Sequence, residues 1–243
     1  MLHSFTGGRE GRNPQGGLTI GPNGVLYGTT TSGGELTACS GYGCGTVFGL
    51  VPPASPGGEW RKAVLHSFTG GSDGANPAAS LIIDTNGVLY GTAPNGGAST
   101  ACAGYGCGTV FKLAPPPSQG GTWAETVLYS FTNENGDGAI PIAGLALSQD
   151  GALYGTTTQS GEIPGCHGYG CGTVFMLMPP PSPGGAWTET VLHRFKSTDG
   201  AYPEGVLVIG KNGLLYGTTT YGGTSMTCAS SLRGCGTVFE LRP

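Results

Sequence analysis

Between Gly24 and Leu50 the sequence reads GVLYGTTTSGGELTACSGYGCGTVFGL, and the rest of the chain is organised around this stretch. Equivalent residues recur every 62 to 64 positions, as shown by the tyrosines Tyr27, Tyr90, Tyr154 and Tyr216. Self-similarity at a fixed period is the signature of a repeat architecture. We therefore divide the chain into four repeats within one domain: residues 1–63, 64–126, 127–190 and 191–243.

Each repeat predicts four short strands, and none shows helical periodicity. In the second repeat, residues 80–83 form a short apolar run that ends at Asp84-Thr85-Asn86-Gly87. Asn-Gly between two apolar runs is a strong hairpin signal, because both residues tolerate a positive φ. Residues 88–92 are therefore the antiparallel partner. We expect a third strand at 108–113, after the cysteine loop, and a fourth at 123–131.

Four antiparallel strands per repeat, arranged in a ring, describe a β-propeller blade. We therefore predict an all-β, four-bladed β-propeller whose core lies between blades, because a single blade cannot bury both faces. The chain begins with Leu2-His3-Ser4-Phe5, which matches the end of a fourth strand, and it ends with a third strand, Gly236 to Leu241. We expect the N-terminal strand to complete the last blade and close the ring, which would also remove exposed edges.

Composition and charge restrict the partners of the chain. Charged residues make up only 10% and the formal net charge is −4, so no basic stripe is present to neutralise phosphates. Nucleic acid is therefore not an expected partner. No apolar run approaches the ~18 residues needed to cross a bilayer. The sequence shows no signal peptide before the first repeat, and we expect either that a leader has been removed or that the natural chain is longer.

The eight cysteines follow the repeat. Eight cysteines allow 105 connectivities, but a repeated unit makes local pairing the simplest. The predicted disulfides are Cys39–Cys44, Cys102–Cys107, Cys166–Cys171 and Cys228–Cys235. Free thiols or a metal remain alternatives, although only His167 stands near a pair. Disulfides persist in oxidising compartments, so we expect an extracellular or cell-surface protein.

The repeated LYGTT…GG…GTVF…VLHSF…DGA.P pattern resembles the GloVer tandem repeat, named after Gloeobacter and Verrucomicrobia proteins. The matching residues in the second repeat include Leu89 to Thr92, Gly108 to Phe111, and Asp73-Gly74-Ala75-Asn76-Pro77. The strand contents also resemble blades of NHL and related propellers. The resemblance implies a secreted or surface-anchored bacterial protein, often with a C-terminal sorting signal, which does not follow Leu241 here. It implies no established activity and no catalytic residues.

Two sets of side chains recur in the loops that a propeller would place on one face. The loops between the second and third strands carry the tyrosines Tyr42, Tyr105 and Tyr169, and the loops between repeats carry the acids Glu10, Asp73, Asp137 and Asp199. Aromatic rings stack on sugars, and carboxylates accept hydrogen bonds from hydroxyls. The sets therefore predict a ligand surface. The alternative interpretation is turn chemistry, in which each acid caps its own loop and each tyrosine covers a disulfide.

Other candidate residues depart from the repeat or lie on the strands. The fourth repeat has Ser230-Ser231-Leu232-Arg233 where the others have Gly-Tyr-Gly, and Arg233 joins the candidate binding residues. The fourth strands carry His3, His66 and His193, with Tyr129 at the equivalent place. Because these strands are the outer ones, the side chains should lie far apart. We expect them to pack and form hydrogen bonds between blades.

The leading functional interpretation is an extracellular binding or surface-structural module that recognises a glycan or another cell-surface component. A glycosidase- or lyase-like enzyme is the first alternative, since loop carboxylates from different blades could approach the ~5–9.5 Å that glycosidases use. A self-assembling structural subunit, present as a homo-oligomer, is the second. Four near-identical acids show no division into acid and base, so the repeat favours multivalent binding over catalysis. No cofactor is expected, although the same carboxylates could hold a calcium ion.

Overall fold

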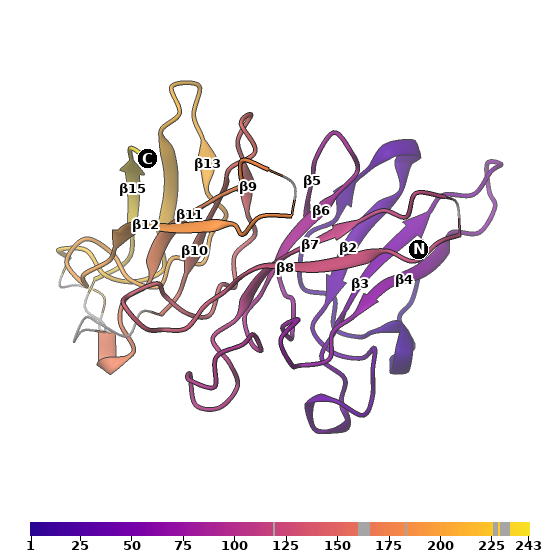
Figure 1. The fold of residues 1–243 in the computed structure, drawn as a ribbon, viewed down its shortest axis with the longest axis horizontal. Coiled ribbons are helices and arrows are strands. Elements are labelled where there is room, and N and C mark those ends of the chain that lie inside the picture. The colour runs from indigo at the N-terminus through magenta and orange to yellow at the C-terminus, as the bar shows by residue number, and fades with distance from the viewer. Residues whose placement is uncertain (119, 160–165, 183, 226–227, 229–233) are drawn as a thin grey trace.

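The computed structural model describes residues 1–243 except 119, 160–165, 183, 226–227 and 229–233 (Figure 1). The described residues form antiparallel β-sheets and four short 3-10 turns, with no α-helix among them. Sheets 1 to 3 each contain four strands, and sheet 4 contains three. Sheet 1 comprises β1 (Thr19–Ile20), β2 (Leu26–Thr30), β3 (Thr46–Val51) and β4 (Arg61–Ser67). Sheet 2 comprises β5 (Ile82–Ile83), β6 (Leu89–Ala93), β7 (Thr109–Ala114) and β8 (Ala124–Ser130).

The second half of the chain repeats this arrangement. Sheet 3 comprises β9 (Ala146–Leu147), β10 (Leu153–Thr157), β11 (Thr173–Met178) and β12 (Thr188–Arg194), and sheet 4 comprises β13 (Val208–Ile209), β14 (Leu215–Thr219) and β15 (Thr237–Leu241). The 3-10 turns are η1 (Gly8–Glu10), η2 (Pro22–Gly24), η3 (Cys39–Gly41) and η4 (Cys166–Gly168). Within each sheet the strands follow chain order, as in the meander of a propeller blade. The all-β prediction and its repeated meander are confirmed.

The predicted hairpins form where the turn residues stand. β5 pairs with β6 so that Ile82 faces Tyr90, and the backbone N–H of Gly87 donates to the carbonyl of Asp84 at 3.1 Å. The Asp84 carboxylate accepts the backbone N–H groups of Asn86 and Val88 at 2.8 and 2.9 Å, which holds the turn. The residue types between the strands thus produce the hairpin that the sequence predicts.

The glycine of the LYGT motif makes room for the aromatic ring of the adjacent strand. A Cβ on Gly91 would lie 2.6 Å from Cζ of Phe111 and 2.7 Å from a methyl carbon of Leu81. Equivalent positions in the other three sheets meet the same phenylalanine and leucine. Glycine is required here because the ring of the third strand lies over the second strand.

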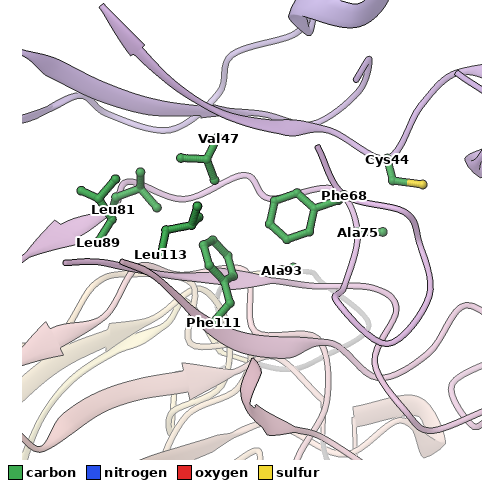
Figure 2. Packing of buried hydrophobic residues seen from close by; sticks show 9 residues of the cluster. All are labelled: Cys44, Val47, Phe68, Ala75, Leu81, Leu89, Ala93, Phe111 and Leu113. Atoms are coloured by element: carbon green, nitrogen blue, oxygen red, sulfur yellow. The ribbon is translucent and has the colours of Figure 1, made fainter. Parts of the chain in front are cut away.

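The core lies between consecutive sheets, as predicted. Figure 2 shows the first cluster, between sheets 1 and 2. Val47 of β3 and Phe68, directly after β4, pack against Phe111 of β7 and Leu81, directly before β5. Two similar clusters follow between sheets 2 and 3 and between sheets 3 and 4. The same edge-to-face phenylalanine pair recurs in each, with ring centroids 5.1 to 5.2 Å apart: Phe68–Phe111, Phe131–Phe175 and Phe195–Phe239.

The predicted ring closure is not shown among the described residues. Residues 1–7 form no strand, and β15 pairs only with β14. The ring of Phe5 instead packs on Phe48 of sheet 1 at 5.2 Å, in the same way as the internal phenylalanine pairs. The N-terminal segment therefore occupies the place of a strand end that precedes sheet 1.

Candidate functional site

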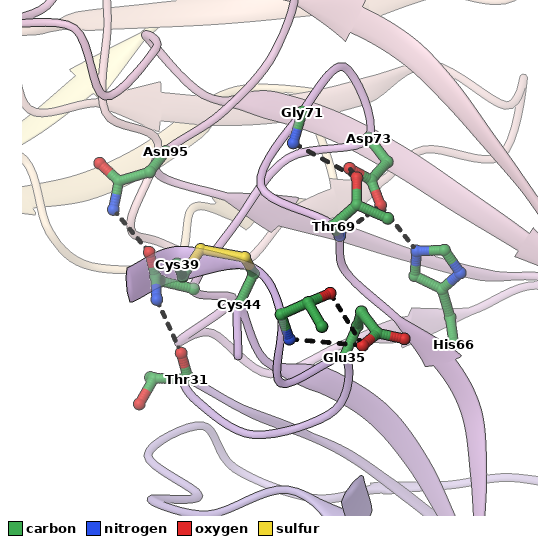
Figure 3. The surroundings of a disulfide bond; sticks show 11 residues. Thr31, Glu35, Cys39, Cys44, His66, Thr69, Gly71, Asp73 and Asn95 are labelled. Atoms are coloured by element: carbon green, nitrogen blue, oxygen red, sulfur yellow. Dashed lines mark hydrogen bonds and ion pairs between the residues drawn. A yellow bond between two sulfur atoms is a disulfide. The ribbon is translucent and has the colours of Figure 1, made fainter. Parts of the chain in front are cut away.

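The disulfide loops and the loops between sheets meet on one face. The loop between β2 and β3 contains the first disulfide, and the loop between β4 and β5 passes directly over it (Figure 3). A Cβ on Gly70 would lie 2.7 and 2.9 Å from the two sulfurs, so only glycine fits there. The backbone N–H of Asn76 donates to the carbonyl of Cys44 at 2.7 Å. The first disulfide loop thus supports the chain that enters sheet 2.

The four predicted disulfides are present. The bonds join Cys39 to Cys44, Cys102 to Cys107, Cys166 to Cys171 and Cys228 to Cys235, with Cα atoms 5.3 to 5.4 Å apart. The backbone bond from the next loop to the second cysteine recurs at Ile140 and Tyr202, both at 2.9 Å. The local pairing prediction is therefore confirmed, and the first three small loops are each tied to the chain that enters the next sheet.

The tyrosines of the disulfide loops project into solvent. Tyr42, Tyr105 and Tyr169 are 62, 75 and 63% exposed. The guanidinium of Arg12 lies 5.0 Å from the ring centroid of Tyr42. These rings are therefore available to a ligand and do not serve the core.

A cleft of about 390 Å³ lies between the disulfide loops of sheets 1 and 2. Its walls include Tyr105, the amides Asn76 and Asn95, and the hydroxyls Ser99 and Thr100. Asn95 donates to the Asn76 side-chain oxygen at 3.1 Å, and Asn76 donates to the carbonyl of Thr31 at 2.8 Å. The two amides are thereby held in place between one exposed aromatic ring and several hydroxyl groups. This arrangement offers both stacking and hydrogen bonding to a polar ligand.

The four predicted acids are engaged in their own loops. The carboxylate of Asp73 accepts the backbone N–H and hydroxyl of Thr69 at 2.8 and 2.6 Å (Figure 3). Asp137 accepts the same two groups of Thr132 at 2.8 and 2.9 Å. Glu10 accepts both groups of Thr6, and Asp199 accepts the backbone N–H of Lys196 at 2.7 Å. Each acid therefore caps its loop, as the turn interpretation holds.

The strand histidines pair with these acids. His3, His66 and His193 lie 3.6, 3.4 and 3.2 Å from the carboxylates of Glu10, Asp73 and Asp199. In the third repeat the Tyr129 hydroxyl donates to Asp137 at 3.2 Å. Burial by itself would raise the pKa of Asp73, but the hydrogen bonds from His66 and Thr69 outweigh it and leave the pKa below its ordinary value. We expected the histidines to form hydrogen bonds between blades. Instead, each histidine pairs with the acid in the loop that follows its own segment.

Sequence reasoning missed a second charged side chain beside three of these four pairs. Lys62, Glu125 and Glu189 occupy equivalent places in the fourth strands of sheets 1, 2 and 3. Each faces the acid that precedes its sheet: Lys62 donates to the backbone carbonyl of Glu10, and Glu125 and Glu189 interact electrostatically with Asp73 and Asp137. The recurrence of a charge on a strand at the repeat spacing is the signal that could have revealed them.

Glu189 contributes to a polar pocket of about 330 Å³ between sheets 2 and 3. The pocket is also lined by Tyr129, Asp137 and Arg194. Arg194 donates from Nε to the carbonyl of Gly136 at 3.1 Å. Burial, followed by the negative charge of Asp137, raises the pKa of Glu189 to about 7.

Glu189→Gln should stabilise the protein in a pH-dependent way. The folded state holds a proton on Glu189 that the unfolded state, with a pKa of 4.5, releases as the pH rises. Stability from this group is therefore highest below pH 4.5 and is lost as the pH rises to about 7. Allowing for partial solvent screening, the variant should be about 1–2 kcal/mol more stable at pH 8 and equal to the parent near pH 4.5. Urea unfolding at both pH values tests this, and a difference that does not vary with pH contradicts it.

One predicted binding residue cannot be placed in the structure. Arg233 and the Ser-Ser-Leu stretch before it lie outside the described residues. Among the described residues, no group of three His, Cys, Asp or Glu side chains is placed to hold a metal ion. In the same part of the chain, no helix is long and apolar enough to cross a membrane.

Comparison with a model of the Gloeobacter/Verrucomicrobia repeat gives matches over residues 1–162 and 40–243, which together cover the whole chain. The chain belongs to this repeat family. No curated protein matches this member of the Gloeobacter/Verrucomicrobia repeat family. The resemblance drawn from the LYGTT and GTVF motifs is thereby confirmed.

Solved structures similar to this Gloeobacter/Verrucomicrobia repeat protein share little sequence with it. A structure described as a putative gluconolactonase is 17% identical, with a TM-score of 0.45, over 93% of this chain and 63% of that protein. A gluconolactonase from Xanthomonas campestris is 16% identical, with a TM-score of 0.47, over 91% of this chain and 60% of that protein. A xylan β-1,4-xylosidase from Bacillus halodurans is 13% identical, with a TM-score of 0.46, over 96% of this chain and 43% of that protein. The chain thus spans less than two thirds of these proteins.

Proposed function

We propose that the chain is an extracellular binding module that takes a glycan in the cleft between its first two disulfide loops. The observation that carries this proposal is the 75% exposed ring of Tyr105 on a polar cleft of about 390 Å³. An aromatic face with nearby amides matches the apolar face and the hydroxyl groups of a sugar. The ring stacks on the apolar face of a pyranose.

The polar wall supplies the hydrogen bonds. Asn76 and Asn95 are aligned by their mutual bond and by the carbonyl of Thr31. Ser99 and Thr100 add hydroxyl groups on the second loop. Because hydroxyls and amides both donate and accept, this set suits the alternating donors and acceptors of a sugar ring.

The chemistry of the loop acids supports binding over hydrolysis. Asp73 accepts hydrogen bonds from Thr69 and pairs with His66, and the other three loop acids also accept hydrogen bonds from their own loops. A glycosidase needs one carboxyl that donates a proton and a second that attacks or activates water. Carboxylates that each cap a loop in the same way do not provide those two roles.

The four disulfides support placement outside the cell. Bonds of this kind persist in oxidising compartments, where thiol reductants do not keep cysteines reduced. Since the first two bonds lie in the loops that line the cleft, an oxidising environment also maintains the binding face.

Tyr105→Ala should weaken glycan binding about tenfold, equivalent to ~1.4 kcal/mol. A glycan array probed with the oxidised protein identifies a sugar, and calorimetry then gives the dissociation constant for each variant. Tyr105→Phe keeps the ring and serves as the matched control, with affinity close to that of the parent. Neither change should alter the melting temperature, because the side chain is exposed.

Mild reduction of the disulfides should abolish the binding while leaving the sheets folded, as measured by circular dichroism. A protein that binds no sugar in the oxidised state contradicts the proposal. So does a Tyr105→Ala variant that binds the selected sugar as tightly as the parent.

A further inference from the structure

A pocket of about 550 Å³ lies between sheets 2 and 3, apart from the glycan cleft. On the side of sheet 2 it is lined by Lys112 of β7 and by residues 126–128 of β8. On the side of sheet 3 it is lined by the proline-rich loop between β11 and β12, and by Trp187. That loop and the disulfide at Cys171 lie at opposite ends of β11, so this pocket opens away from the disulfide loops.

Lys112 gives the pocket a positive charge. In the register of sheet 2 it lies between Tyr90 and Thr126, and its side chain is half-buried. Among the described residues that line the pocket, it alone is charged. No ion pair joins Lys112 to an acid in the described part of the chain. The equivalent residues of the other sheets are Gly49, Met176 and Glu240, so this charge is particular to the second sheet.

The tryptophan of the pocket is arranged differently from its counterpart between sheets 1 and 2. There, Trp123 packs edge to face on Tyr27, with ring centroids 5.9 Å apart. Gly49 lies beside that tyrosine, and it has no side chain to compete for the space. Between sheets 2 and 3, Lys112 occupies the equivalent position. Trp187 packs on the core cluster with one part of its ring and borders the pocket with another.

Neutral polar groups complete the lining. Thr126 and Ser182 contribute hydroxyl groups from opposite sides of the pocket, and both residues are exposed. β8 is the outermost strand of sheet 2, so part of its backbone faces outward at residues 126–128. Hydroxyls and backbone amides both donate and accept hydrogen bonds. The pocket therefore combines an aromatic ring, uncharged hydrogen-bonding groups and one cation.

We propose that this pocket binds an acidic sugar, a pyranose that carries a carboxylate or a sulfate. The ring of Trp187 packs against the apolar face of the pyranose. The ammonium group of Lys112 donates charge-assisted hydrogen bonds to the acidic substituent. The hydroxyls of Thr126 and Ser182 bind the hydroxyl groups of the sugar.

Charge and lining together favour this ligand over other anions. The chain has a formal net charge of −4, so it does not attract polyanions as a whole, and an anion must be selected locally. A single lysine beside hydroxyl groups and an aromatic ring matches one acidic group on a sugar ring better than a run of carboxylates on an acidic peptide. The pocket shares no residue with the glycan cleft, so the two proposals can fail separately.

Calorimetry with trigalacturonate and with a sulfated galactose oligosaccharide tests the proposal. The parent should bind at least one of them, and the one that binds identifies the acidic group. Lys112→Gln should weaken that binding about tenfold, because the charge-assisted bonds are lost. Lys196→Gln removes the same charge from an exposed position outside the pocket, and it should bind as the parent does.

The tryptophan has a matched control of its own. Trp187→Leu should also weaken binding about tenfold, whereas Trp123→Leu should not, although both changes remove an indole that packs on a core cluster. Circular dichroism verifies that each variant is folded. If Trp187→Leu does not fold, Lys112→Gln and its control still decide the result. Tyr105→Ala, which should weaken binding at the cleft, should leave the affinity for the acidic sugar unchanged.

Three outcomes overturn the proposal. One is a parent protein that binds neither acidic sugar. Another is equal affinity for trigalacturonate and its neutral methyl ester, which means that the acidic group is not recognised. The third is equal affinity for hexaglutamate, which means that negative charge alone is selected and the sugar ring is not.

Discussion

Replacing Phe131 with alanine should lower the free energy of unfolding by about 3–5 kcal/mol. The ring has no exposed surface, and it contacts Tyr129 and Phe175 edge to face at 5.0 and 5.2 Å. It lies in the cluster between sheets 2 and 3, where its removal leaves a cavity that neighbouring sheets cannot fill. Urea unfolding followed by tryptophan fluorescence gives the difference.

Phe5→Ala is the matched control for Phe131→Ala. Phe5 makes the same contact, with Phe48, but its ring is only partly buried. The expected loss is about 1–2 kcal/mol, because less apolar surface is buried there. Equal losses for the two variants would mean that the clusters between sheets are not the source of stability.

Gly108→Ala should destabilise the protein by about 2–4 kcal/mol. The residue has a φ of +96°, and an added Cβ would lie 2.5 Å from Cδ of Pro141 and 2.7 Å from the carbonyl oxygen of Ala93. Pro141 belongs to the loop that enters the next sheet, so the methyl group would push consecutive sheets apart. Thermal and urea unfolding measure the effect.

Gly57→Ala separates backbone strain from crowding. Gly57 has a similar φ of +82°, but a Cβ there would meet nothing within 4 Å. We therefore expect a loss of only about 1 kcal/mol, the cost of the left-handed backbone for alanine. If both variants lose the same amount, the contact with Pro141 carries no energy and the proposed role of this glycine is wrong.

The predictions that succeeded concern short spans of sequence. The hairpin at Asp84–Gly87, the disulfides of five- or seven-residue separation and the third strands of each repeat all depend on residues near one another in the chain. Turn chemistry and alternation of side chains act locally, so the pattern of residues is enough to predict them. The location of the core between sheets also followed, because four similar units must bury similar faces.

The site could be predicted only in part. The exposed tyrosines and the loop acids were identified, because each repeats at one position. Their partners were not identified. His66 on β4 pairs with Asp73 in the loop that follows this strand, and Glu189 on β12 lies against Asp137 in the loop between β8 and β9. Which charges meet depends on how strands from different sheets are placed, and the spacing along the chain carries no such information.

The sequence by itself determined the four repeats, their strands, their turns and their disulfides. Tertiary structure alone decided which side chains share a pocket. A repeat specifies which positions are equivalent but does not specify which charges meet. Asp137 and Glu189 lie far apart in the sequence and share a pocket only because sheets 2 and 3 lie side by side.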